Sequence, residues 1–266
     1  MGLAGDVYAF LTDPANWSGD EGIPTLFFEH LQISFWSMVV AAAIALPIGV
    51  LVGHARKGGV VAVNLANIGR AIPSFGLLLL MVIWIGNKPQ PFPLSLPGNL
   101  PVSLVLIALA VPPMLTNAYV AIAEIDPEVR EAGRGMGLNG RQMLTQVELP
   151  MGVPLIMAGV RISAVAVVAT ATIAAFVGFG GFGRYIIDGF KQADGDAKLW
   201  AGALLVGVFA LAVEGLLALV QRWLTPKGLR VGSHGPLVAM AEGDEPAAAS
   251  GTGPDAESRA AGDTVL

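Results

Sequence analysis

Residues 124–150 read EIDPEVREAGRGMGLNGRQMLTQVELP, a highly charged stretch between two long apolar runs. Ionised groups are expensive in hydrocarbon, so this stretch must lie in water. Its arginines, Arg130, Arg134 and Arg141, favour the cytoplasmic side, because cytoplasmic loops carry an excess of basic residues. The stretch therefore predicts a cytoplasmic loop between two membrane spans.

The first half of the loop is predicted to be a short helix. Asp126 suits the N-cap and Pro127 the first helical position. Glu128 and Glu131 fall in the first turns, where the helix dipole favours carboxylates. Gly137 is expected to end this helix, because glycine adopts the left-handed conformation without strain.

The second half is predicted to be another short helix, which follows a turn at Asn139-Gly140. It runs over residues 141–149, and Pro150 is expected to break it. Small residues on the first helix would let another protein approach its backbone closely; they are Ala132, Gly133 and Gly135. The loop is therefore predicted to be a docking element.

The loop also resembles a known motif. Glu131-Ala132-Gly133, Gly137, Val147 and Leu149-Pro150 are similar to the EAA loop of ABC importer permeases with the MetI-like fold. Gly133 and Val147 stand where that motif usually has alanine and isoleucine. The resemblance implies that the first helix is a coupling helix, which lies in a groove of an ATPase subunit. The implied coupling residues are Glu128, Glu131, Ala132, Gly133, Gly137, Leu149 and Pro150. The alternative is an ordinary amphipathic cytoplasmic loop.

The composition predicts an all-α integral membrane protein. Of the 266 residues, 54% are hydrophobic and only 13% charged, with a mean hydropathy of +0.67. A soluble globular protein has about 25% charged residues. Apolar runs of about 20 residues recur, as helical membrane spans require. The chain has no cysteine, and its histidines (His30, His54 and His234) form no metal-binding constellation. We expect no metal site and no nucleic-acid partner.

The apolar runs predict about five transmembrane helices, or six if residues 60–86 form two. The predicted spans cover residues 31–53, 60–86, 100–123, 155–179 and 199–224. Residues 1–29 are expected to be an external leader, residues 30–230 the permease domain, and residues 231–266 a disordered cytoplasmic tail. The basic residues place the N-terminus outside and the C-terminus inside a bacterial cytoplasmic membrane.

Two proline-containing segments are candidates for a translocation pathway. Residues 69–75 and 112–117 place prolines beside polar groups inside apolar runs, which predicts broken helices. The candidate pathway residues are Arg70, Pro73, Ser74, Phe75, Pro112, Pro113, Thr116 and Asn117. For the first segment the alternative is a proline kink, with Arg70 reaching the cytoplasmic interface.

Three further features have predicted structural roles. His30 is expected at the outer membrane interface rather than in a ligand set. The glycine-rich run 178–183 lacks the lysine of a phosphate-binding loop and is expected to be a turn or a hinge. Glu214 lies deep in a span, where a carboxylate suggests function. A packing role is favoured for it, because no basic or histidine relay partner recurs on neighbouring spans.

Other segments are similar to osmoprotectant permeases for glycine betaine, choline and carnitine. They are Ile72-Pro73-Ser74, Gly181-Phe182-Gly183, Ile187, Gly189, Asp194, Gly202-Ala203-Leu204 and residues 224–230. Arg70 and Ala71 depart from that pattern, which has glutamine and threonine at these places. The resemblance covers residues 30–230 and implies quaternary-ammonium substrates.

The predicted function is therefore the permease subunit of a binding-protein-dependent ABC importer. The sequence has no Gly-x-x-x-x-Gly-Lys-[Ser/Thr] loop, so a separate ATPase is expected to bind ATP and Mg²⁺, and this chain is expected to be non-catalytic. The resemblance implies two ATP-binding subunits, a second permease subunit and an extracytoplasmic binding protein. The alternatives are an ion-gradient-driven secondary transporter, an importer of another small solute such as an amino acid, and a membrane scaffold.

Overall fold

The computed structural model describes residues 2–59, 63–64, 68, 73–86, 100–226 and 228. Within these ranges the regular elements are helical. They are α1 (Leu3–Thr12), η1 (Pro14–Trp17), α2 (Ile23–Ala55), α4 (Ser74–Ile85), α5 (Leu100–Ala123), α6 (Pro127–Gly135), α7 (Gly140–Gln142), η2 (Met143–Glu148), α8 (Leu149–Ala171), η3 (Thr172–Val177), α9 (Gly183–Lys191) and α10 (Asp196–Leu224). The chain divides into two units, Met1–Lys227 and Gly228–Leu266, and of the second unit the structure describes Gly228 alone.

Four helices in the described ranges are long and apolar enough to cross a membrane. They are α2, α5, the continuous helix Gly140–Val177, and α10. This confirms the all-α membrane class. α4 has 12 residues, a length of about 18 Å against a hydrocarbon core of about 30 Å. Much of the predicted span 60–86 lies outside the described residues, so the number of spans stays a prediction.

The predicted helix break at Pro112 and Pro113 is wrong, because α5 runs through both residues. Prolines lack the N–H that an α-helix needs, but they are tolerated in membrane helices that neighbouring helices cover. Two carbonyl groups near them also accept side-chain hydrogen bonds. Ser163 Oγ of α8 donates to the carbonyl oxygen of Ala110 at 2.9 Å. Asn117 Nδ2 donates to the carbonyl oxygen of Pro113 at 2.8 Å. Both prolines are buried.

The predicted break at Pro150 is also wrong. Residues 140–177 form one helix of 38 residues. The segment η2, immediately before α8, has π-helical geometry. Pro150 lies in the first turn of α8, directly after the change from π to α geometry. A proline is tolerated there, because the first turn of an α-helix does not need its N–H.

α5 is the centre of the helix packing, and it has extensive contacts with both α2 and α8. The α2–α5 contact is close because Gly49 and Gly53 of α2 have no side chain. A Cβ at Gly49 would lie 2.7 Å from Ala118 Cβ and from the carbonyl oxygen of Leu115. Small residues of this kind allow membrane helices to approach each other closely. The core around this contact contains Ile33, Ala41, Ala45, Leu78, Val105, Leu106, Met114 and Val167.

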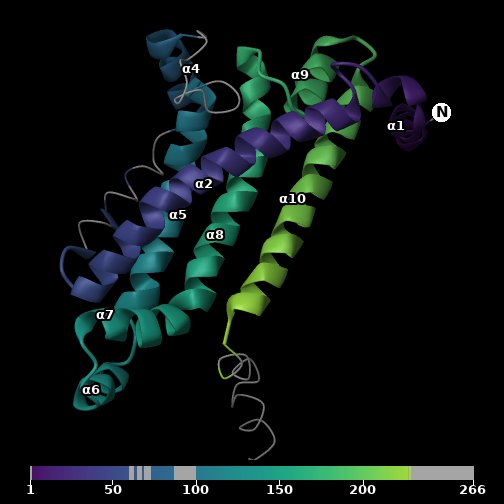
Figure 1. The fold of residues 1–266 in the computed structure, drawn as a ribbon. Coiled ribbons are helices and arrows are strands. Elements are labelled where there is room, and N and C mark those ends of the chain that lie inside the picture. Colours follow the sequence, from purple (N-terminus) through teal and green to yellow (C-terminus); the bar gives the residue numbers. More distant parts are fainter. Residues whose placement is uncertain are drawn as a thin grey trace, which may run out of the picture. The chain divides into compact units, whose positions relative to one another are not determined.

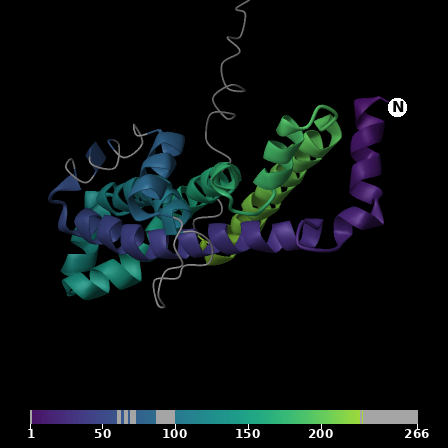
Figure 2. The same ribbon diagram turned by 90° about the horizontal axis from the view of Figure 1, so that it is seen from above.

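The short helices lie at opposite ends of the long ones. Figure 1 shows α6 and α7 at one end of α5 and α8, and α9 at the other end. Figure 2 shows α9 beside α10, and the two helices are in contact. The short amphipathic helix α6 is therefore well separated from α9, and each end of the unit has its own set of polar side chains.

Candidate functional site

The helix α6 has the caps that the sequence predicts. The Asp126 carboxylate accepts a hydrogen bond from the backbone N–H of Glu128 at 2.9 Å, and Pro127 is the first helical residue. After the helix, Gly137 has a φ of 84°. The N–H of Leu138 then donates to the carbonyl oxygen of Gly133 at 3.1 Å, which closes the helix end.

The start of the second helix differs slightly from the prediction. Asn139 is not a turn residue but the N-cap of α7, which begins at Gly140. Its side chain accepts from the N–H of Gln142 at 2.9 Å, and the Gln142 side chain accepts from the N–H of Asn139 at the same distance. This reciprocal capping box satisfies two backbone donors.

The residues predicted to form the docking surface divide into an outer and an inner group. Glu128, Glu131 and Ala132 are exposed on α6. Gly133 is buried, so its predicted place on the docking surface is wrong. A Cβ at Gly133 would collide with the end of the Met143 side chain, so the missing side chain lets α6 pack against η2. Gly137 is exposed, and Leu149 and Pro150 are half-buried at the start of α8.

A buried ion network lies directly behind α6. Glu148, at the end of η2, is 0% exposed, and Arg130, on the inner face of α6, is 4% exposed. Arg130 Nε lies 3.2 Å from Glu148 Oε1. The other oxygen, Glu148 Oε2, accepts from His54 Nδ1 of α2 at 2.5 Å. Arg130 Nη2 donates to the carbonyl oxygen of Ile122 in α5 at 2.5 Å.

The network joins α6 to α2, α5 and the start of α8, and sequence reasoning missed it. Burial lowers the pKa of Arg130, with smaller contributions from Arg56 and Arg134, while the negative charge of Glu148 acts to raise it. The available signal was Glu148 itself, an acidic residue next to the apolar start of a span. The sequence does not reveal its partners, because His54 is 94 residues away.

The described pathway candidates do not form one cluster. In α5, Pro113 and Asn117 face α8, because a Cβ at Gly159 would lie 2.6 Å from Asn117 Cβ. Thr116 Oγ1 is buried without a hydrogen-bond partner among the described residues. At the start of α4, Pro73 and Phe75 are exposed and Ser74 is half-buried. Arg70 lies outside the described residues. A pathway role for these residues stays a prediction.

Phe75 has an aromatic neighbour that the sequence does not indicate. Its ring meets the ring of Phe176, in η3, edge to face at a centroid distance of 5.3 Å. Both side chains are exposed in this chain. The contact joins the start of α4 to the 3-10 helix η3, which follows α8.

Glu214 has a basic partner, contrary to the sequence-based expectation. Arg161 of α8 forms an ion pair with Glu214 of α10, through both Nε and Nη2. Arg161 Nη1 also donates to Gln221 Oε1 at 2.6 Å, and Gln221 Nε2 donates to the carbonyl oxygen of Pro154 at 3.0 Å. These bonds connect α8 and α10 inside their spans, and they agree with a packing role for Glu214.

His30 is buried inside the protein, and its predicted place at the outer membrane interface stays a prediction. Its Nε2 donates to the carbonyl oxygen of Val168 in α8 at 2.9 Å. The preceding residue, Glu29, accepts from the N–H of Gly181 at 2.9 Å. Gly181 has a φ of 81°, and a Cβ at Gly180 would collide with the Glu29 carboxylate. The glycine-rich run is therefore a turn that packs against α2.

A second set of polar contacts joins α9 to the segment before α2. Arg184 Nη2 donates to Glu21 Oε1 at 2.8 Å, and the Tyr185 hydroxyl donates to the carbonyl oxygen of Glu21 at 2.5 Å. Burial raises the pKa of Tyr185 to about 12, with a further contribution from the charge of Glu21. The hydroxyl therefore keeps its proton at neutral pH and remains a donor.

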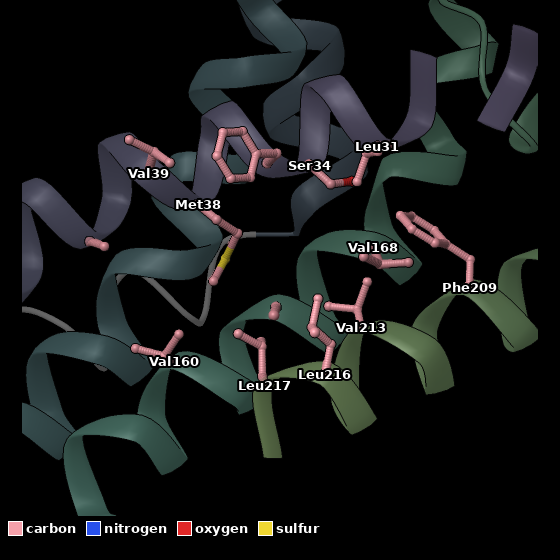
Figure 3. A pocket seen from close by; sticks show the side chains of 13 residues that line it. Leu31, Ser34, Met38, Val39, Val160, Val168, Phe209, Val213, Leu216 and Leu217 are labelled. Carbon is pink, nitrogen blue, oxygen red and sulfur yellow. The ribbon is translucent and has the colours of Figure 1, made fainter. Parts of the chain in front are cut away.

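The pocket between α2, α8 and α10 offers no polar recognition. It has a volume of about 330 Å³, and its lining is apolar apart from Ser34. Figure 3 shows Met38 of α2, Val160 of α8 and Leu217 of α10 around it. Within the described ranges, no group of three His, Cys, Asp or Glu side chains could hold a metal ion. The ion network behind α6 joins residues of four elements, α2, α5, α6 and η2, and is therefore the candidate functional site.

Comparison with known proteins gives a consistent assignment. Residues 45–226 match the family described as binding-protein-dependent transport system inner membrane component. The chain is 33% identical over 208 residues to the carnitine transport permease protein OpuCB of Listeria monocytogenes, covering 78% of this chain and 90% of that protein. It is 31% identical over 228 residues to the osmoprotectant import permease protein OsmW of Salmonella typhimurium, covering 85% of this chain and 100% of that protein.

A solved structure with the same fold is the inward-facing MetNI methionine ABC transporter. The TM-score is 0.63 at 23% identity, and the match covers 77% of this chain and 96% of that chain. The family match extends from within α2 to just beyond the end of α10. The chain therefore belongs to the binding-protein-dependent transport system inner membrane components, the membrane permeases of ABC importers.

Proposed function

We propose that this chain is the permease subunit of an importer for a quaternary-ammonium compatible solute, such as glycine betaine, choline or carnitine. It works with a second permease subunit, two ATP-binding subunits and an extracytoplasmic binding protein. ATP and Mg²⁺ are bound by the ATP-binding subunits, and this chain is not catalytic. The helix α6 docks in a groove of one ATP-binding subunit.

The observation that carries this proposal is the two-sided character of α6. Its outer face presents Glu128, Glu131 and Ala132 to solvent. Its inner face is fixed by Arg130 and by the close contact of Gly133 with Met143. A helix that is anchored on one side and free on the other can pass a force from a docked partner to the membrane spans.

The substrate class is inferred from the relatives. The two permeases compared above are named for carnitine and for osmoprotectant import, and a Bacillus subtilis relative at 33% identity is named for glycine betaine, carnitine and choline. A quaternary ammonium group is attracted to aromatic faces. In this proposal the exposed pair Phe75 and Phe176 contacts the substrate on the pathway. Arg70, Ser74 and the α5 residues Thr116 and Asn117 are the other proposed pathway residues.

The orientation is also part of the proposal. Basic residues gather at the α6 end of the unit; they are Arg56, Lys57, Arg130, Arg134, Arg141 and Arg222. Cytoplasmic loops carry an excess of Lys and Arg. We therefore place α6 in the cytoplasm of a bacterium, with the N-terminus outside and the C-terminus inside the cytoplasmic membrane.

Co-purification tests the proposal. The chain is expressed with the ATPase and any second permease encoded beside it, and the complex is extracted in mild detergent. ATP hydrolysis is then measured with the binding protein, either empty or loaded with glycine betaine. We expect a stable complex whose ATP hydrolysis rises with loaded binding protein.

Other outcomes separate the alternatives. A stable complex whose ATP hydrolysis does not change with glycine betaine but rises with an amino acid such as methionine would support an importer. It would reject the quaternary-ammonium substrate class. The absence of any complex, with uptake driven by a proton or sodium gradient, would support a secondary transporter instead.

A further inference from the structure

The inner face of α6 has few anchors, and one of them is ionic. Of the nine residues of α6, only Arg130 and Gly133 are buried. Gly133 packs closely against Met143, and its carbonyl oxygen accepts the hydrogen bond from Leu138 that closes the helix end. Among the contacts described for α6, Arg130 makes the ion pair with Glu148 and the bond to the carbonyl of Ile122. The orientation of α6 therefore depends strongly on the Arg130 side chain.

Glu148 occupies the point where the surrounding helices meet. It accepts from His54, in the last turn of α2, and pairs with Arg130 of α6 through its other oxygen. It is also the last residue of η2 and is followed directly by α8. π-helical turns often occur at functional positions. One carboxylate thus connects α6 with α2 and with the start of α8.

The buried ion pair of Arg130 with Glu148 is not needed for a stable core. A buried ion pair is often no more stabilising than an apolar pair of similar volume, because both charges lose their hydration. A fully buried carboxylate with two partners on different helices does, however, fix the relative positions of those helices. The network therefore fits a mechanical role better than a purely stabilising one.

We propose that Arg130 and Glu148 are positioning residues that transmit the movement of the coupling helix α6 to α2 and α8. This inference rests on the proposed function, in which ATP-driven closure moves α6. Arg130 and Glu148 touch neither ATP nor substrate in this proposal. Their role is to make the inner face of α6 rigid, while the exposed face binds the ATPase.

The test measures transport per ATP hydrolysed. Glu148→Gln, Arg130→Gln and the double variant are each purified with the ATPase and reconstituted in proteoliposomes. The matched control is Glu124→Gln, the same substitution at an exposed carboxylate just before α6. Uptake of glycine betaine and ATP hydrolysis are measured on the same vesicles.

We expect the single variants to keep the bound ATPase and their ATP hydrolysis. Their uptake per ATP should fall about tenfold, within the range typical of coupling between separate sites. The double variant should recover part of this ratio, because it leaves no unpaired buried charge and two Gln side chains can still form a hydrogen bond. Glu124→Gln should match the unmodified chain.

The opposite pattern would overturn the inference. If uptake and ATP hydrolysis fall together, with an unchanged ratio, the network is only structural. Should Glu148→Gln fail to reach the membrane, Glu148→Asp keeps the charge on a shorter side chain, and a wild-type ratio in that variant also rejects the inference. Failure of the unmodified chain to bind the ATPase would instead reject the proposed function.

Discussion

Glu131 and Arg130 are neighbours in the sequence, but their side chains have opposite surroundings. Glu131 is exposed on the outer face of α6, and Arg130 is buried against Glu148. Helical geometry separates them, because adjacent residues on a helix do not share a face. At the residue scale, Glu131 is thus free to contact a partner protein, while Arg130 contacts the interior of this chain.

Reversing the charge at Glu131 tests whether the outer face of α6 is the docking surface. Glu131→Lys should leave membrane insertion and stability intact, because exposed substitutions usually change stability by less than about 0.5 kcal/mol. It should abolish the coupling of ATP hydrolysis to uptake, since the outer face of α6 would carry the opposite charge. Proteoliposome uptake and ATP hydrolysis measure this, with Glu124→Lys as the control. Normal uptake in Glu131→Lys would count against the docking assignment.

The Arg161–Glu214 ion pair gives a second prediction at this scale. Glu214→Leu should destabilise the protein by about 1–3 kcal/mol, the usual cost of leaving a buried polar group without its partner, because it removes the carboxylate that pairs with Arg161. Adding Arg161→Met should restore most of the stability. The midpoint of thermal unfolding in detergent measures both changes. A double variant no more stable than Glu214→Leu alone would show that pairing is not the reason for this site.

At the scale of helices, the close approach of α2 to α5 depends on two glycines. Gly49 faces the backbone carbonyl of Leu115, and Gly53 faces that of Tyr119. A backbone cannot move aside as a flexible side chain can. Gly133 is different, because its neighbour is the flexible end of Met143.

Adding one methyl group tests the α2–α5 contact. Gly49→Ala should lower stability by about 1–3 kcal/mol, the usual cost of overpacking. The control is Gly207→Ala in α10, where a Cβ would meet nothing within 4 Å. That control should be neutral or slightly stabilising, because alanine favours helix more than glycine does. Thermal unfolding in detergent compares the two, and equal midpoints would contradict the close contact.

At the scale of the whole molecule, the four long helices differ in their burial. α5 is the most buried of them, and α10 is the least buried. α10 exposes large apolar side chains along its length, among them Leu204, Leu211, Leu219 and Trp223. An apolar helix with exposed apolar faces is stable in lipid or against another apolar subunit, as a membrane permease requires.

The C-terminal residues give a prediction that is based on composition, since residues 235–266 lie outside the described residues. They are mainly Ala, Gly, Pro, Asp and Glu and have few large apolar groups, a composition from which we expect no contribution to a packed core. Deleting residues 235–266 should leave uptake nearly unchanged, as measured in proteoliposomes against the full chain. A complete loss of uptake would assign this segment a role in transport.

The sequence by itself determined the membrane class, the family and the local structure of α6. These properties depend on residues that are close together in the chain. Apolar runs of membrane length predict spans, and Asp126, Pro127 and Gly137 act within one or two turns of the helix that they bound. The EAA-like spacing of Glu131, Gly137 and Pro150 is likewise local, and the family match confirms the resemblance.

Only the tertiary structure decided which of these residues face inward. Gly133 is buried because Met143 lies opposite it, and Glu148 is buried because His54 and Arg130 reach it from other helices. The same holds for the partner of Glu214 and for the continuous helices at Pro113 and Pro150. A hydrogen-bond or ion-pair partner far away in the sequence leaves no local periodicity, so the folded chain alone reveals it.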